Sequence, residues 1–103
     1  MVLSDGRLAS GSFDNTIRLW DTSTGECQTV LKGHTGVVCS LVVLSDGRLA
    51  SCSYDKTIRL WDTSTGECQK VLKGHTKYVY SLVVLSDGRL ASASDDMTIR
   101  LWQ

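Results

Sequence analysis

The stretch SDGRLASCSYDKTIRLWD, residues 45–62, decides the fold because the chain contains it three times with small changes. Residues 4–21 read SDGRLASGSFDNTIRLWD, and residues 86–102 read SDGRLASASDDMTIRLW. The copies are 41 residues apart. A period of about 40 residues indicates supersecondary units that cannot bury their own faces and must pack against one another. The sequence therefore predicts a single array of repeated units over residues 1–103.

Each unit is predicted to contain four short antiparallel strands. The apolar run at 37–44 is typical of a strand covered on both faces. Asp46-Gly47 follows it and predicts a two-residue type I′ hairpin, in which both central residues have a positive φ. The other strands are expected at 48–53, 57–61 and 67–72. Because the chain has no proline and no helical periodicity, the predicted fold class is all-β.

The charge balance and hydropathy exclude several classes of partner. Lysine and arginine number 11, as do aspartate and glutamate, so no net charge attracts nucleic acid or an anionic membrane. No apolar run approaches the roughly 20 residues of a membrane-spanning helix. The opening MVLSDGRLAS lacks the basic and apolar regions of a signal peptide. We therefore expect a soluble, cytoplasmic protein with no nucleic-acid or membrane partner.

The four cysteines do not form a metal or redox motif. Cys27, Cys39, Cys52 and Cys68 include no C-x-x-C pair, and no Cys/His cluster has zinc-finger spacing. We expect buried free thiols, with no metal and no cofactor. Cys39 and Cys52 fall on consecutive predicted strands, where they could come close to each other.

Several short motifs resemble the tryptophan–aspartate (WD) repeat of β-propeller proteins. They are Gly33-His34, Ser45-Asp46-Gly47, Leu49-Ala50-Ser51 and the run Asp55-x-Thr57-Ile58-Arg59-Leu60-Trp61-Asp62. The resemblance implies propeller blades of four antiparallel strands each, in an incomplete ring. For this chain it implies a partial blade at 1–31, a full blade at 32–72 and a partial blade at 73–103.

Two departures from the family pattern bear on function. Gln103 stands where Asp21 and Asp62 end the other copies. Family members close a ring of about seven blades, whereas this chain holds about two and a half repeats. Two blade faces and several strand edges would lie bare in a monomer. Association of identical chains would cover them, giving six blades from two chains or nine from three.

The leading functional hypothesis is therefore a non-catalytic, self-assembling propeller fragment. Its partner would be itself, in a homo-oligomer of two or three chains. The near-identity of the repeats suggests an engineered or reconstructed sequence.

The family resemblance also implies a hydrogen-bonded tetrad of serine, histidine, aspartate and tryptophan in each blade. The matching positions are Ser10, Asp14 and Trp20; His34, Ser51, Asp55 and Trp61; and His75, Ser92, Asp96 and Trp102. Serine, histidine and aspartate also make up hydrolase triads. However, no G-x-S-x-G nucleophile elbow is present, and a catalytic site would not recur in every unit. We interpret the tetrads as structural and the protein as not an enzyme; the first set lacks a histidine.

Differences between the copies cluster after the Gly-His pair and at the turn between the second and third strands. Both places lie at one end of a blade, so the differences gather on the propeller face where the family commonly holds peptides and proteins. The aromatic and cationic residues there are Phe13, Tyr54, Lys77, Tyr78 and Tyr80. The alternative function is thus a protein- or peptide-binding scaffold from a longer WD-repeat protein. Neutral drift at positions that packing leaves free is the competing interpretation of these differences.

Overall fold

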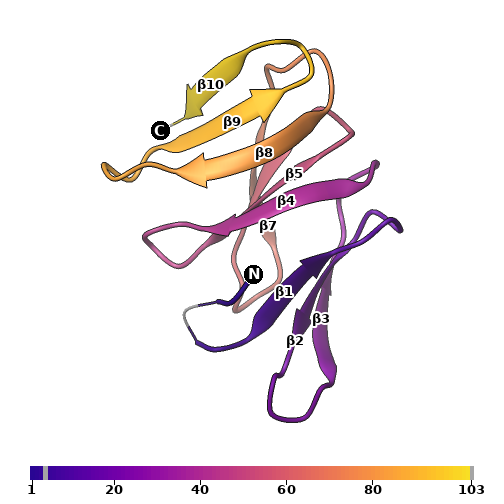
Figure 1. Ribbon diagram of the computed structural model, residues 1–103. Helices are drawn as coiled ribbons and strands as arrows, with labels where there is room; N and C mark the ends of the chain where they lie inside the picture. Colours follow the sequence, from indigo (N-terminus) through magenta and orange to yellow (C-terminus); the bar gives the residue numbers. More distant parts are fainter. Residues whose placement is uncertain (4, 103) are drawn as a thin grey trace.

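The computed structural model describes residues 1–3 and 5–102, which form ten strands in three antiparallel sheets (Figure 1). The first sheet contains β1 (Leu8–Gly11), β2 (Ile17–Trp20) and β3 (Cys27–Leu31). The middle sheet contains β4 (Val38–Val43), β5 (Leu49–Ser53), β6 (Ile58–Trp61) and β7 (Cys68–Leu72). The third sheet contains β8 (Val79–Val84), β9 (Leu90–Ser94) and β10 (Ile99–Trp102). Ser4 and Gln103, and with them the departure at the third WD position, lie outside the described residues.

The middle sheet shows the complete repeated unit and confirms the predicted all-β class. Its strands follow the order β4-β5-β6-β7, each antiparallel to the next. The first and third sheets repeat its register at equivalent positions. The equivalent pairs are Ser10 with Arg18, Ser51 with Arg59, and Ser92 with Arg100. Repeated sequence thus gives repeated strand pairing.

Among residues 1–3 and 5–102 there is no helix long and apolar enough to cross a membrane.

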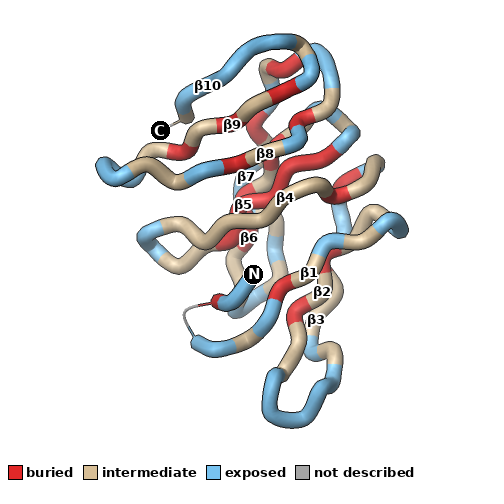
Figure 2. Tube along the Cα trace, viewed as in Figure 1, coloured by how far each residue is buried: buried red, intermediate tan, exposed pale blue. Residues whose placement is uncertain are grey.

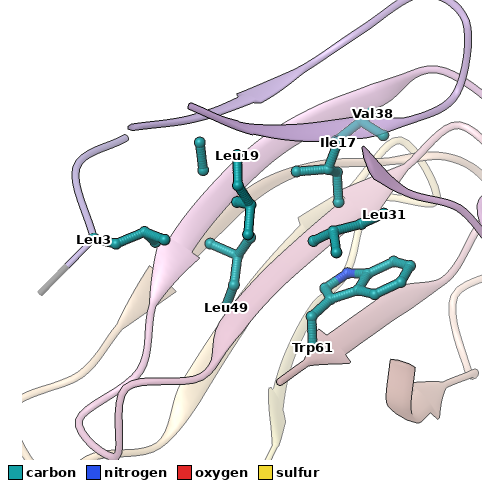
Figure 3. Packing of buried hydrophobic residues seen from close by; sticks show 8 residues of the cluster. Leu3, Ile17, Leu19, Leu31, Val38, Leu49 and Trp61 are labelled. Carbon is teal, nitrogen blue, oxygen red and sulfur yellow. The ribbon is translucent and has the colours of Figure 1, made fainter. Parts of the chain in front are cut away.

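The three sheets lie face to face in a fan, with β4 beside both β1 and β8 (Figure 1). Each junction between sheets is an apolar layer. The first joins Leu3, Ala9, Ile17, Leu19 and Leu31 of the first sheet to Val38, Leu49 and Trp61 of the middle sheet. The second joins Ala50, Cys52, Ile58, Leu60 and Leu72 of the middle sheet to Val79, Leu82 and Leu90 of the third. Figure 3 shows the first layer, where Leu31 lies over the Trp61 ring.

The strand that is buried on both faces is β5, whereas the sequence predicted that strand at 37–44. Every residue of β5 is buried, but in β4 only Val38 is (Figure 2). The reason is position: β5 lies inside the middle sheet, with a neighbouring sheet on each face, while β4 lies at its edge. Apolarity alone did not indicate that β5 is the enclosed strand, because its sequence LASCS is only weakly apolar. Its small side chains allow the neighbouring sheets to approach closely.

The β4–β5 hairpin has a three-residue loop in place of the predicted two-residue type I′ turn. Gly47 has φ +90°, but Asp46 is not among the residues with positive φ. The Gly47 N–H donates to the Leu44 carbonyl at 3.0 Å, and the Leu44 N–H donates to the Arg48 carbonyl at 2.8 Å. The Asp46 carboxylate accepts hydrogen bonds from the Arg48 N–H and Nε–H. This local bonding stabilises a turn with glycine alone in the left-handed region.

The turns between the second and third strands place a residue other than glycine in the left-handed region. Asn15, Lys56 and Met97 occupy this position with φ of 73°, 74° and 70°. Asparagine tolerates this conformation, whereas a methionine there brings Cβ against its own backbone. Met97 is exposed, so its side chain offsets little of that strain through packing.

Met97→Gly should therefore raise the free energy of unfolding by about 0.5–1 kcal/mol, measured by urea denaturation at fixed protein concentration. Met97→Ala is the matched control: it keeps the Cβ and should give no such gain. Equal stabilisation by both substitutions would show that backbone strain is not the cause.

Candidate functional site

A buried hydrogen-bond chain connects the loop before β4 to β5 and β6. The Trp61 indole N–H donates to Ser51 Oγ at 2.8 Å. The Ser51 hydroxyl then donates to His34 Nε2 at 2.6 Å, and His34 Nδ1–H donates to Asp55 Oδ2 at 2.8 Å. Because tryptophan can only donate and a carboxylate can only accept, the chain is satisfied when the protons run in one direction, with a neutral His34 that accepts at Nε2 and donates from Nδ1. All four groups are thus satisfied inside the sheet.

The Asp55 carboxylate is fixed by two threonines that the sequence analysis did not assign to the site. Thr57 donates to Oδ1 through its N–H at 2.9 Å and its hydroxyl at 2.6 Å. The Thr35 N–H donates to Oδ2 at 3.0 Å. Burial raises the pKa of Asp55, but these hydrogen bonds and the one from His34 outweigh it and lower the pKa overall. The Asp-x-Thr spacing is the signal that could have identified Thr57.

Burial also decides the direction in which the pKa of His34 is shifted. It lowers the pKa of the imidazole more than the hydrogen bond to Asp55 raises it. The side chain of His34 is fully buried, and burial favours the neutral form, which the hydrogen-bond chain can satisfy at both ring nitrogens.

The third sheet repeats the arrangement with its own residues. Trp102 Nε1–H donates to Ser92 Oγ at 2.8 Å, the Ser92 hydroxyl bonds His75 Nε2 at 2.7 Å, and His75 Nδ1–H bonds Asp96 Oδ2 at 2.9 Å. Hydrogen bonds from Thr98 and His75 outweigh partial desolvation and hold the pKa of Asp96 well below its usual range.

The first sheet holds three of the four groups. Trp20 Nε1–H donates to Ser10 Oγ at 2.9 Å. Asp14 Oδ1 accepts from the Thr16 N–H at 3.0 Å and from its hydroxyl at 2.6 Å. The chain has two histidines, and both belong to the other sheets. Ser10 and Trp20 are only half-buried, so water can reach them.

The Ser51–His34–Asp55 connectivity matches that of a hydrolase triad, but its surroundings differ. Ser51 is fully buried, and its hydroxyl oxygen already accepts the Trp61 N–H. A nucleophilic serine must be accessible to a bound substrate, whereas Ser51 is enclosed within the protein. Chemically, the arrangement is suited to tying the Gly-His loop to β5 and β6.

Three residues of the predicted variable face form an aromatic cluster between the middle and third sheets. Tyr54 stacks on Tyr78 with ring centroids 4.4 Å apart, and Tyr78 meets Tyr80 edge-on at 6.3 Å. The neighbouring Asp95 carboxylate raises the pKa of Tyr78. Lys77 is exposed and directly precedes Tyr78.

Phe13 lies apart from this cluster, at the junction of the first and middle sheets. It is exposed and lines a shallow groove with Gly11, Ser12, Val37 and Val38. The sequence therefore grouped Phe13 with residues that belong to a different junction.

The cysteines are free thiols, but only Cys52 is buried. The prediction of buried thiols was wrong for the half-buried Cys27, Cys39 and Cys68, because these lie on strands at the edges of their sheets. Burial, with a smaller contribution from nearby Cys39, raises the pKa of the Cys52 thiol to about 12. Among the described residues, no group of three or more His, Cys, Asp or Glu side chains is placed to hold a metal ion.

The sequence model of the WD40 family, described as the WD domain or G-beta repeat, matches residues 2–21, 25–62 and 66–103. The chain belongs to the WD40 family. The matched repeat and the sheet are out of phase, since 25–62 takes in β3 of the first sheet together with β4, β5 and β6. The matches at 25–62 and 66–103 thus each link two sheets, whereas 2–21 lies within the first sheet.

Relatives and a solved structure support the same assignment. The chain is 58% identical over 36 residues to ribosome assembly protein 4 of Chaetomium thermophilum, covering 35% of this chain and 7% of that protein. It is 45% identical over 38 residues to WD repeat-containing protein 86 of Homo sapiens, covering 37% of this chain and 10% of that protein. The crystal structure of the WD40 β-propeller domain of Doa1 superimposes with a TM-score of 0.94 at 29% identity, covering 100% of this chain and 35% of that one. The predicted β-propeller fold is confirmed, and the chain spans a tenth or less of these curated relatives.

Ser51→Ala should lower the free energy of unfolding by about 2–4 kcal/mol, because it leaves the buried Trp61 N–H and His34 Nε2 without partners. Ser10→Ala is the matched control and should cost less than about 1 kcal/mol, because water can replace the serine beside half-buried Trp20. Chemical denaturation of both variants measures the difference. Similar losses would mean that burial of the network contributes little.

Proposed function

We propose that the chain is a non-catalytic propeller segment whose function is assembly: copies associate through their open sheet faces into a closed homo-oligomeric β-propeller. The observation that carries the proposal is the exposure of Ile99. Its equivalents Ile17 and Ile58 are 0% exposed in the junctions between sheets, whereas Ile99 is 74% exposed. The close identity of the repeats also supports an engineered or reconstructed origin.

The free face of the third sheet, which we call the C-face, carries the residues of a junction without its neighbour. Val83 and Leu101 are exposed, as Ile99 is. Figure 2 shows β10 exposed along most of its length. A groove of about 280 Å³ runs over this face and is lined by Ser81, Val83, Leu85, Ala91, Ser92, Ala93 and Ile99. An apolar surface of this kind favours burial against a partner.

The free face of the first sheet, the N-face, carries the other half of a junction. Leu8 is 38% exposed, while its equivalent Leu49 is 0% exposed against the first sheet. Trp20 is likewise half-buried, whereas Trp61 is buried. The C-face and N-face therefore offer the same residue types that already pack together twice within the chain.

A C-face of one copy on an N-face of the next is a head-to-tail contact. Such contacts close into a ring when a whole number of rotations from one sheet to the next makes one full turn. With three sheets a chain, two copies give six sheets and three copies give nine.

We propose that the chain is non-catalytic because Ser51 is buried and its hydroxyl is already bonded to both the Trp61 N–H and His34 Nε2. We also propose a cytoplasmic location and no cofactor, in keeping with the balanced charge.

Light scattering coupled to size exclusion tests the assembly. The wild-type chain should have the mass of two or three copies, and Ile99→Lys should reduce the mass to that of one copy because it places a charge in the junction. Met97→Lys is the matched control, since the equivalent Lys56 remains exposed beside a formed junction. A folded, cooperatively melting wild-type monomer would contradict the proposal.

A second candidate function is a protein- or peptide-binding scaffold, favoured by the Tyr54–Tyr78–Tyr80 cluster. Half-exposed tyrosines beside Lys77 are side chains that recur at binding hot spots. Tyr78→Ala and Tyr80→Ala should then abolish binding on a peptide array without changing the oligomeric mass, while Phe13→Ala, outside the cluster, should not. Retention of all peptide binding in the tyrosine variants would argue against the scaffold.

A further inference from the structure

We propose that Cys39 and Cys52 form a thiol–disulfide site, at which a small disulfide such as oxidised glutathione converts the two thiols into a bond between β4 and β5. The inference goes beyond assembly and does not depend on it, because both cysteines lie in the middle sheet and neither belongs to the C-face or the N-face. The site is not a property of the repeat, since the equivalents of Cys52 are Gly11 and Ala93.

A β-bulge in β4 brings the two cysteines to one cross-strand position. The register with β5 shifts between Val38 and Ser40, and Ser40 is the partner of Cys52. Cys39 is therefore the extra residue of the bulge, and it lies opposite Cys52 together with Ser40. Opposite residues of antiparallel strands have Cα atoms about 4.5–5.5 Å apart, and disulfides join Cα atoms about 4.4–6.8 Å apart. The strand pairing thus suits a disulfide.

The two side chains also face the same way. Cys52 belongs to the apolar layer between the middle and third sheets, and Cys39 packs against the same layer. Val38, the residue before Cys39, belongs to the opposite layer, as alternation along a strand requires. A charge on Cys39 raises the pKa of the Cys52 thiol, which requires the two sulfur atoms to be near each other.

The two thiols differ in their access to a dissolved reagent. Cys52 is 0% exposed, whereas Cys39 is half-buried. A small disulfide therefore reaches Cys39 first, and the enclosed Cys52 reacts only with its neighbour.

The reaction consists of two exchange steps. The Cys39 thiolate attacks one sulfur of oxidised glutathione, which forms a mixed disulfide and releases the first glutathione. The Cys52 sulfur then attacks the Cys39 sulfur and releases the second. The two cysteine protons end on the two released glutathione thiols. The cysteines lose two electrons, and oxidised glutathione gains them.

The environment of the pair makes this exchange slow in both directions. Burial, with a smaller contribution from the Asp55 carboxylate, raises the pKa of Cys39, and burial raises that of Cys52 to about 12. Because the thiolate is the attacking species, oxidation should accelerate as the pH rises. A thiolate of high pKa is also a poor leaving group, so the bond should be slow to reduce. The site is suited to a lasting link rather than to rapid redox cycling.

The test incubates the full chain with oxidised glutathione at mildly alkaline pH, alkylates the remaining thiols and maps a tryptic digest by mass spectrometry without reduction. Trypsin cleaves after lysine and arginine, which leaves each cysteine on its own peptide: 19–32, 33–48, 49–56 and 60–70. Peptide 33–48 should be joined to 49–56 in material that runs as a single chain on a non-reducing gel. Cysteines 39 and 52 that stay alkylated, carry only glutathione or join other chains would overturn the inference.

Two single substitutions separate the exchange steps. Cys52→Ala supplies the residue that Ala93 provides at the equivalent position of β9, and Cys39 should then keep one glutathione. Cys39→Ala should leave Cys52 reduced, because no partner presents a mixed disulfide to it. Cys68→Ser is the matched control, since it removes a half-buried cysteine elsewhere in the middle sheet and should leave the 33–48 to 49–56 link intact. Glutathione on Cys52 in Cys39→Ala would contradict the proposed order of attack.

A second measurement needs no variant. The Tyr54 N–H donates to the Val37 carbonyl at 2.9 Å just beyond the bulge, and the equivalent Asp95 N–H donates to the Tyr78 carbonyl at 3.1 Å. The third sheet has the same bulge without cysteines. Oxidation should slow hydrogen exchange of the Tyr54 N–H several-fold and leave that of Asp95 unchanged. Equal exchange of Tyr54 before and after oxidation would show that β4 and β5 are not linked there.

Discussion

Face-to-face packing between sheets is the constraint on which this structure depends. Each sheet has short strands with apolar side chains on both faces: in the middle sheet Leu49 and Trp61 point to one neighbour, Ala50 and Ile58 to the other. A three- or four-stranded sheet of this size has no interior of its own and is stabilised by the layers on either side. Within the chain only the middle sheet has both layers, which is why β5 is its most buried strand.

Whereas the apolar layers lie between sheets, each polar network lies within one sheet. The chain from Trp61 through Ser51 and His34 to Asp55 fixes the loop that leads into β4. In the third sheet the same network fixes the residues around Lys77 and Tyr78, so a buried and repeated set of bonds positions the least repeated part of the surface. Loops held by such a scaffold are where binding commonly develops.

The offset between repeat and sheet bears on the assembly proposal. A family repeat ends in one sheet and begins in the one before it, so consecutive sheets share covalent connections as well as an apolar layer. The first sheet has its outer strand β3 but only the start of an inner strand, and the third sheet has its inner strand β8. The result is two uncovered sheet faces, each matched by a covered equivalent elsewhere in the chain.

The sequence by itself determined the period and the number of strands in a unit, because these follow from local patterns that the repeats copy. The residue types of the hydrogen-bond networks were implied by the resemblance of the sequence to the WD repeat. Strand positions came within about one residue for β5, β6 and β7, since turn residues mark their limits. Tertiary structure alone decided that β5 rather than β4 is enclosed, that Tyr54 stacks on Tyr78, and that only Cys52 is buried. These features depend on which sheet lies against which, and contacts between distant residues leave no signature in a local pattern.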